Sequence, residues 1–121
     1  MSVSKEGGKE VAIKMELGKT IVLRTEEDGT GLLSYEGGIF SLSEVSTLIL
    51  NELYNKKSIT NIAHLIFKEY DVTMLEVKQD MEAFFTQLCS LEIITREYLE
   101  AAKRELDNCE QGKDGEYQMG Q

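Results

Sequence analysis

The chain has 121 residues, enough for one domain with a single core and too few for two such cores. Its 22 Asp and Glu residues outnumber its 13 Lys and Arg residues, so a net charge of −9 repels nucleic-acid phosphates and favours a peptide or protein partner. No secretory signal is recognisable, and no stretch approaches the roughly 20 apolar residues that span a bilayer. We therefore expect a cytoplasmic protein with no membrane contact.

Short β-branched runs separated by glycines predict a small antiparallel sheet in the first third of the chain. Residues 1–18 are polar, and a weak alternation at Val11, Ile13 and Met15 fits a flexible extension and a short strand equally well. The run TIVLRT at 20–25, a turn with two glycines and the run LLSY predict a hairpin. The run IFSL, after a pair of glycines, adds a third strand. We expect a three-stranded sheet.

Three helices are predicted after the sheet, each from a capping residue and an apolar face. Ser41 or Ser43 can cap the first helix, Ser58 can cap the second, and Thr73 with Glu76 forms a capping box for the third. The third helix has the widest apolar stripe, which consists of Val77, Met81, Phe84, Phe85, Leu88 and Leu91.

The end of the chain is more polar. Residues 95–106 combine i,i+4 charge pairs with a thin apolar line and predict a fourth helix. Residues 107–121 have too little apolar surface to offset their ordering entropy, so we expect a disordered acidic tail. The chain then divides into an extension at 1–18, a folded domain at 19–94, a helix and a tail.

Residues suited to catalysis or metal binding are scarce. His64 is the only histidine, and its place beside Ala63 on a helix is typical of a surface or boundary histidine. Cys89 lies among apolar helix residues and Cys109 in the polar tail, so the two thiols and His64 lack the paired spacing of a zinc site. The turn glycines are not followed by the Lys-Ser or Lys-Thr of a phosphate loop. We predict no enzyme activity, no cofactor and no metal.

Strands followed by three helices also suit a winged-helix DNA-binding regulator, which is the alternative function. The third helix would then present basic or amide side chains to the bases. Its charged and amide residues are Glu76, Lys78, Gln79, Asp80, Glu82 and Gln87. Three acidic groups outnumber the single basic one, so charge opposes DNA binding. A helical adaptor whose third helix meets a partner protein is a further alternative.

The third strand and the third helix together predict a peptide-binding cleft. The free edge of such a strand can accept an extended peptide, with backbone hydrogen bonds from Gly38 to Leu42 setting the register. Pockets between this strand and the apolar helix would select side chains of the peptide. The same edge can pair with a second copy of the chain, so a homodimer stays open.

The order of three segments resembles the PqqD-like family, the recognition elements for precursors of ribosomally synthesised and post-translationally modified peptides (RiPPs). The segments are GGIFSLSEVSTLILNEL, SITNIAHLIFKEYDV and QDMEAFFTQLCSLEII. With the hairpin before them, the resemblance spans about residues 21–94. None of the three is a catalytic signature, and their order and spacing together carry the resemblance.

The resemblance implies a winged-helix-turn-helix-like α+β fold, with a three-stranded antiparallel sheet packed on three helices and a C-terminal helical extension. It also implies that the leader of a precursor peptide adds to the third strand, in a cleft closed by the third helix, and is presented to a modifying enzyme. Radical S-adenosylmethionine (SAM) maturases are the commonest such enzymes, and lasso-peptide proteases and cyclodehydratases use the same module. The peptide-binding residues implied are Gly38, Ile39, Phe40, Ser41, Leu42, Val77, Lys78, Asp80, Met81 and Phe85.

Overall fold

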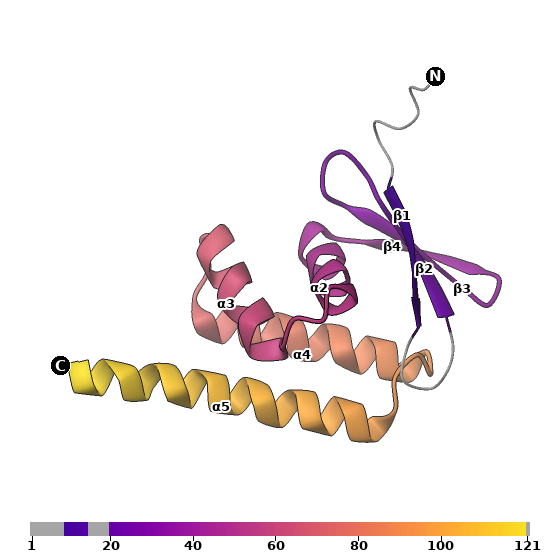
Figure 1. The fold of residues 1–121 in the computed structure, drawn as a ribbon. Coiled ribbons are helices and arrows are strands. Elements are labelled where there is room, and N and C mark those ends of the chain that lie inside the picture. The colour runs from indigo at the N-terminus through magenta and orange to yellow at the C-terminus, as the bar shows by residue number, and fades with distance from the viewer. Residues whose placement is uncertain (1–8, 15–19, 121) are drawn as a thin grey trace. The chain divides into compact units, whose positions relative to one another are not determined.

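The computed structural model describes residues 9–14 and 20–120, with only the backbone for residues 110–120. The chain forms two compact units, Met1–Lys56 and Lys57–Gln121. In the described residues, the first unit contains an antiparallel sheet and one helix, and the second contains three helices (Figure 1). The fold is therefore α+β, as expected, and its winged-helix character stays a prediction.

The sheet has four strands in the described part of the chain, one more than the sequence analysis expected. They are β1 (Lys9–Lys14), β2 (Thr20–Thr25), β3 (Gly31–Tyr35) and β4 (Gly38–Leu42), all antiparallel and in sequence order. Strand β1 pairs with β2 along its whole length, and Ile13 lies opposite Ile21 with both side chains buried. This buried pair explains why the weak alternation near residue 11 forms a strand, whereas Met15 lies outside the described residues.

Helix α2 (Glu44–Tyr54) packs against one face of this sheet. Its N-cap is Ser43, whose side chain accepts a hydrogen bond from the Ser46 amide, as the capping signal predicted. Asn51 donates to the Thr25 hydroxyl oxygen over 3.0 Å and so ties the helix to β2. A β-carbon on Gly31 would lie only 2.6 Å from Thr47 Oγ1, so the glycine permits the close approach of helix and sheet. The buried apolar residues of this unit are Ile13, Ile21, Leu23, Leu33, Tyr35, Ile49 and Leu50.

The second unit consists of α3 (Ile59–Glu69), α4 (Met74–Ser90) and α5 (Arg96–Gly120), which pack on one another (Figure 1). The two predicted caps are confirmed. Ser58 accepts from the Asn61 amide, and Thr73 forms a reciprocal capping box with Glu76. All of the predicted stripe on α4 is buried except Leu91, which is half-buried.

Helix α5 is longer than the helix predicted at 95–106, because its backbone stays helical to Gly120. Two side chains beyond the expected end contact other helices of the same unit. Asp107 Oδ1 lies 2.7 Å from Lys78 Nζ on α4, and the buried Cys109 has its Sγ 3.4 Å from His64 Nε2 on α3. At residues 107–109, within the segment that the sequence analysis expected to be disordered, side-chain contacts accompany the helical backbone.

Candidate functional site

Strand β4 is one edge of the sheet. In the described residues it pairs only with β3, in a register that places Leu33 opposite Phe40 and Ser34 opposite Ile39. An edge strand leaves every second backbone N–H and C=O without a partner in the sheet, and these groups can pair with another chain. The edge of β4 is therefore a candidate site for an extended peptide.

The turn between β3 and β4 determines which backbone groups of β4 point outward. Only Glu36 and Gly37 separate the strands, and their φ angles of 48° and 83° correspond to the type I′ turn of a tight hairpin. In such a turn the first residue and the fourth, Tyr35 and Gly38, form a hydrogen-bonded pair. Because bonded and non-bonded pairs alternate along an antiparallel ladder, Phe40 and Leu42 also bond to β3. The N–H and C=O groups of Ile39 and Ser41 consequently point away from the sheet.

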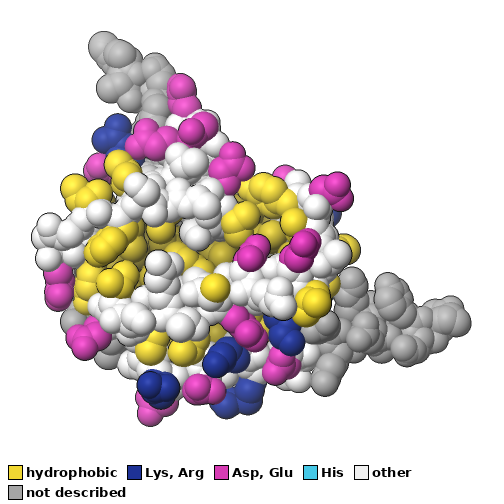
Figure 2. Space-filling model, turned by 180° about the vertical axis from the view of Figure 1, so that it is seen from behind, with side chains coloured by type: hydrophobic (Ala, Val, Ile, Leu, Met, Phe, Trp, Pro, Cys, Tyr) yellow, Lys and Arg dark blue, Asp and Glu magenta, His cyan; other side chains and the backbone are white. Residues whose placement is uncertain are grey.

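The side chains of β4 make its edge apolar. Ile39 has 69% of its surface exposed, the largest fraction among the exposed large hydrophobic residues of the described chain. It lies on the face opposite to that of Leu33 and Phe40, because neighbouring residues of a strand point to opposite faces. Figure 2 shows hydrophobic side chains open to solvent on one side of the molecule. No residue of β4 is charged.

The opposite edge of the sheet, formed by β1, has a different character. Three of its six residues, Lys9, Glu10 and Lys14, are charged and exposed. Charged side chains on an edge strand hinder the addition of another strand, because the added strand would crowd and desolvate them. Of the two edges, β4 is therefore the one better suited to strand addition.

The predicted site residues on α4 have a different environment. Val77, Met81 and Phe85 are at most 1% exposed, and the Phe85 ring packs beside Phe84 and Tyr98. The Lys78 ammonium group pairs with Asp107 of α5, whereas Asp80 is exposed. The structure thus brings the strand residues together on β4 and the helix residues together on α4. Contact of the α4 residues with a peptide stays a prediction.

Helices α3 and α5 share polar contacts that the sequence analysis did not anticipate. The Glu105 carboxylate accepts hydrogen bonds from both the amide and the hydroxyl of Thr60, over 3.1 Å each. One turn further along both helices, Cys109 Sγ lies 3.4 Å from His64 Nε2. Each pair is 45 residues apart in sequence, so periodicity could not reveal them. They hold the start of α3 against α5, where a carboxylate also complements the helix N-terminus.

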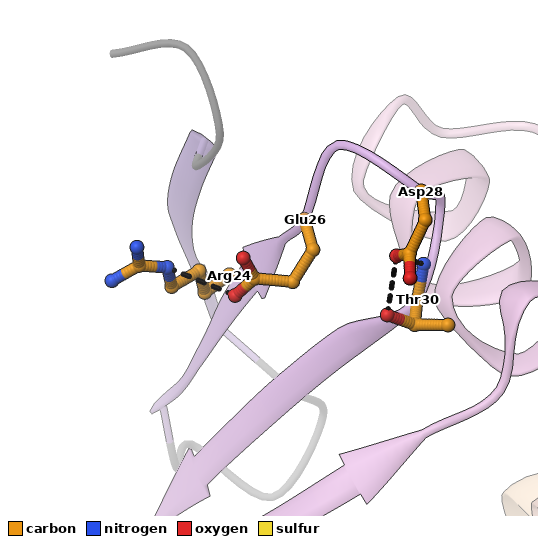
Figure 3. Close-up of polar contacts among 4 residues, drawn as sticks. All are labelled: Arg24, Glu26, Asp28 and Thr30. Atoms are coloured by element: carbon orange, nitrogen blue, oxygen red, sulfur yellow. Dashed lines mark hydrogen bonds and ion pairs between the residues drawn. The ribbon is translucent and has the colours of Figure 1, made fainter. Parts of the chain in front are cut away.

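Acidic side chains gather at the turn between β2 and β3. The Asp28 carboxylate accepts bonds from the Thr30 hydroxyl over 2.6 Å and from the Thr30 amide over 3.0 Å, and these bonds lower the pKa of Asp28 below its ordinary value (Figure 3). Glu26 pairs with Arg24 over 3.1 Å. Asp28 consequently stays ionised to lower pH than an ordinary surface aspartate.

The described residues include neither a metal-binding cluster nor a membrane-spanning helix. No group of three or more His, Cys, Asp or Glu side chains there is placed to hold a metal ion. None of the helices in that part of the chain has the length and apolarity needed to cross a membrane.

Comparison with known proteins gives one result. A family model described as coenzyme PQQ synthesis protein D (PqqD) matches residues 20–94, which is more than half of the chain. Neither a curated protein nor a solved structure matches the chain. The matched range contains β2, β3, β4, α2, α3 and α4, whereas β1 and α5 lie outside it.

Proposed function

Since the chain belongs to the family of coenzyme PQQ synthesis protein D, we propose that it is a non-catalytic recognition protein of RiPP biosynthesis. It binds the leader region of a ribosomally synthesised precursor peptide and presents that leader to a modifying enzyme. Family membership supports a peptide-binding role of this kind. The enzyme that fits best is a radical SAM maturase, because such maturases are the commonest partners of this family.

The observation that carries the proposal is the uncharged edge of β4. A leader segment that extends along this strand pairs with the outward backbone groups of Ile39 and Ser41. Two residues with one donor and one acceptor each allow up to about four hydrogen bonds. Because these bonds use only backbone groups, they provide affinity for many sequences, and side chains next to the strand provide selectivity.

The contacts differ between the strand and the helix. Ile39 and Ser41 are exposed on the strand, and the half-buried Phe40 lies between them on the other face. A peptide can reach these residues without any change in the structure. Met81 and Phe85 on α4 have no exposed surface, so a peptide contacts them only if their present neighbours move.

An amide-shift titration tests the proposal directly. The ¹⁵N-labelled full chain is titrated with the leader of the precursor peptide encoded beside its gene, and hydrogen exchange is followed for each amide. We expect the amides of Ile39 and Ser41 to exchange more slowly in the complex, whereas those of Phe40 and Leu42, already bonded to β3, change little. The matched control is the same leader with N-methylated backbone amides along the strand, which keeps the side chains and removes the donors. Unchanged β4 amides together with a tight complex on DNA would refute the proposal.

A further inference from the structure

The two faces of the sheet are covered differently within the first unit. Helix α2 packs on the face that carries Leu33, because a β-carbon on Gly31, which shares this face, would meet Thr47. Leu32 and Ser34 point to the other face and are only half-buried, whereas Leu33 is buried. Among the described residues of this unit α2 is the only helix, so no helix of the unit covers the face of Leu32 and Ser34.

Ile39 lies at the β4 end of a row of side chains on this second face. The strand register aligns one residue from each strand in the row, which consists of Ala12, Val22, Ser34 and Ile39. Val22 is half-buried between its neighbours, whereas Ile39 is 69% exposed. The neighbour of Ile39 in the row is the small side chain of Ser34, and the sheet of the described residues ends at β4. The row therefore lacks a side chain that would cover Ile39 from beyond the edge.

The backbone of Ile39 determines which residue of an added peptide reaches this place. Its N–H and C=O groups point outward, so in antiparallel addition Ile39 and one peptide residue exchange two hydrogen bonds. The side chains of two directly opposed residues lie on the same face, with their β-carbons about 5 Å apart. The adjacent residues of the peptide point to the other face. A single peptide position therefore extends the row and covers Ile39.

We propose that Ile39 selects the leader by favouring a β-branched or aromatic apolar side chain at the one leader position paired with it. This inference rests on the proposed strand addition and names the residue that makes it selective. An apolar side chain there removes apolar surface of both partners from water, whereas a charged one would lose water without gaining a partner. Ser41 pairs with the leader two residues away on the same face and presents only a hydroxyl, so the apolar preference is confined to the Ile39 position.

A selection from random peptides tests this proposal without a known ligand. A display library of random 14-residue peptides is selected on the full chain and counter-selected on the variant Ser41→Pro, which removes one outward amide of the edge. We expect the enriched peptides to share one position that is β-branched or aromatic. The selection is then repeated on the variant Ile39→Glu, which should fold because Ile39 is 69% exposed. We expect the shared position to change to Lys or Arg, since opposite charges are favourable in directly opposed residues.

A second set of variants tests the same pairing without a charge. Replacing the shared apolar residue of the best peptide by Ala should weaken its binding to the wild-type chain about two- to fivefold, the range of a cross-strand pair. The same replacement should have little effect on binding to Ile39→Ala, because the partner side chain is already absent. Ala12→Glu is the matched control. Ala12 is exposed on the same face of the sheet but on the opposite edge strand, so this variant should enrich the same peptides as the wild type.

The outcomes separate this inference from the proposed function. Peptides that need the Ser41 edge but are enriched unchanged on Ile39→Glu would overturn selection by Ile39 and leave strand addition standing. Peptides whose binding is indifferent to Ser41→Pro would overturn strand addition and, with it, the role of Ile39.

Discussion

Proline substitutions at two neighbouring positions of β4 separate the outward amide from the inward one. Proline has no N–H group, so it is tolerated on an edge strand only where the amide points to solvent. The type I′ turn at Glu36 and Gly37 assigns the Phe40 amide to β3 and the Ser41 amide to the outside. Phe40→Pro should therefore damage the fold, whereas Ser41→Pro should damage binding.

The expected magnitudes follow from the bonds that each substitution removes. Phe40→Pro removes a bond to Leu33 worth about 1 kcal/mol and leaves an acceptor unpaired at a further cost of about 1–3 kcal/mol, so we expect a loss of about 3 kcal/mol in the free energy of unfolding. Ser41→Pro removes no bond of the sheet, and we expect a change within about 1 kcal/mol. In the complex it removes one bond to the leader, which weakens binding between about twofold and about tenfold.

Chemical denaturation measures the stability of each variant, and calorimetric titration measures its affinity for the leader. Phe40→Ala and Ser41→Ala are the matched controls, because they remove the same side chains and keep the amides. If Ser41→Pro destabilises the fold as much as Phe40→Pro does, the alternation of inward and outward amides along β4 is assigned in the wrong phase. Wild-type affinity in a folded Ser41→Pro variant would mean that the leader does not pair with this edge.

Three further predictions concern contacts that support the two units. Gly31→Ala should lower the free energy of unfolding by about 1–3 kcal/mol in denaturation experiments, because the new β-carbon would lie 2.6 Å from Thr47 Oγ1. Adding Thr47→Ala in the same chain should recover part of this loss. If the effects of the two substitutions on stability are simply additive, the contact is contradicted. Leu106→Ala should cost about 2–5 kcal/mol by the same assay, since this side chain is 2% exposed, and a negligible cost would mean that α5 is not part of the core of its unit. Thr30→Ala should raise the pKa of Asp28 towards its ordinary value in an NMR titration, because the hydroxyl bond contributes most to the lowered pKa. The stability that comes from this lowered pKa is present at neutral pH and is lost as the pH falls through the folded pKa, so an unchanged titration in the variant would contradict the role of the hydroxyl.

The elements that the sequence predicted correctly depend on local interactions. Ser43, Ser58 and Thr73 each accept a hydrogen bond from an amide three residues later, so their signals are contained within a few residues. The hairpins are equally local, because glycine-containing turns join runs of β-branched and apolar residues. Local chemistry was sufficient for these parts of the fold.

The elements that the sequence did not predict depend on distant partners. Strand β1 is formed because Ile13 finds a buried partner in Ile21, and a weak alternation alone could not reveal that pairing. The continuation of α5 depends on Lys78 and His64, which are 29 and 45 residues from their partners Asp107 and Cys109. Tertiary contacts thus supplied the stability that the polar composition of this segment lacked.

The strand that carries the candidate site was predicted for the same reason. An uncharged run after a glycine turn is a local pattern, so the strand Gly38–Leu42 could be predicted. The width of the apolar stripe on α4 indicated how much of the helix is covered but not what covers it. Met81 and Phe85 are completely buried in the structure, which leaves Ile39 as the most exposed apolar residue of the predicted site.

Strand β1 lies outside the residues that the family model matches, and it bears on where a peptide can bind. Strand β1 pairs with β2 and so occupies an edge that residues 20–94 alone would leave open. Its own outer edge carries Lys9, Glu10 and Lys14, which oppose further pairing. A strand that approaches this sheet therefore meets a charged edge on one side and an uncharged edge on the other. The charges on β1 consequently favour β4 over β1 as the place of the proposed strand addition.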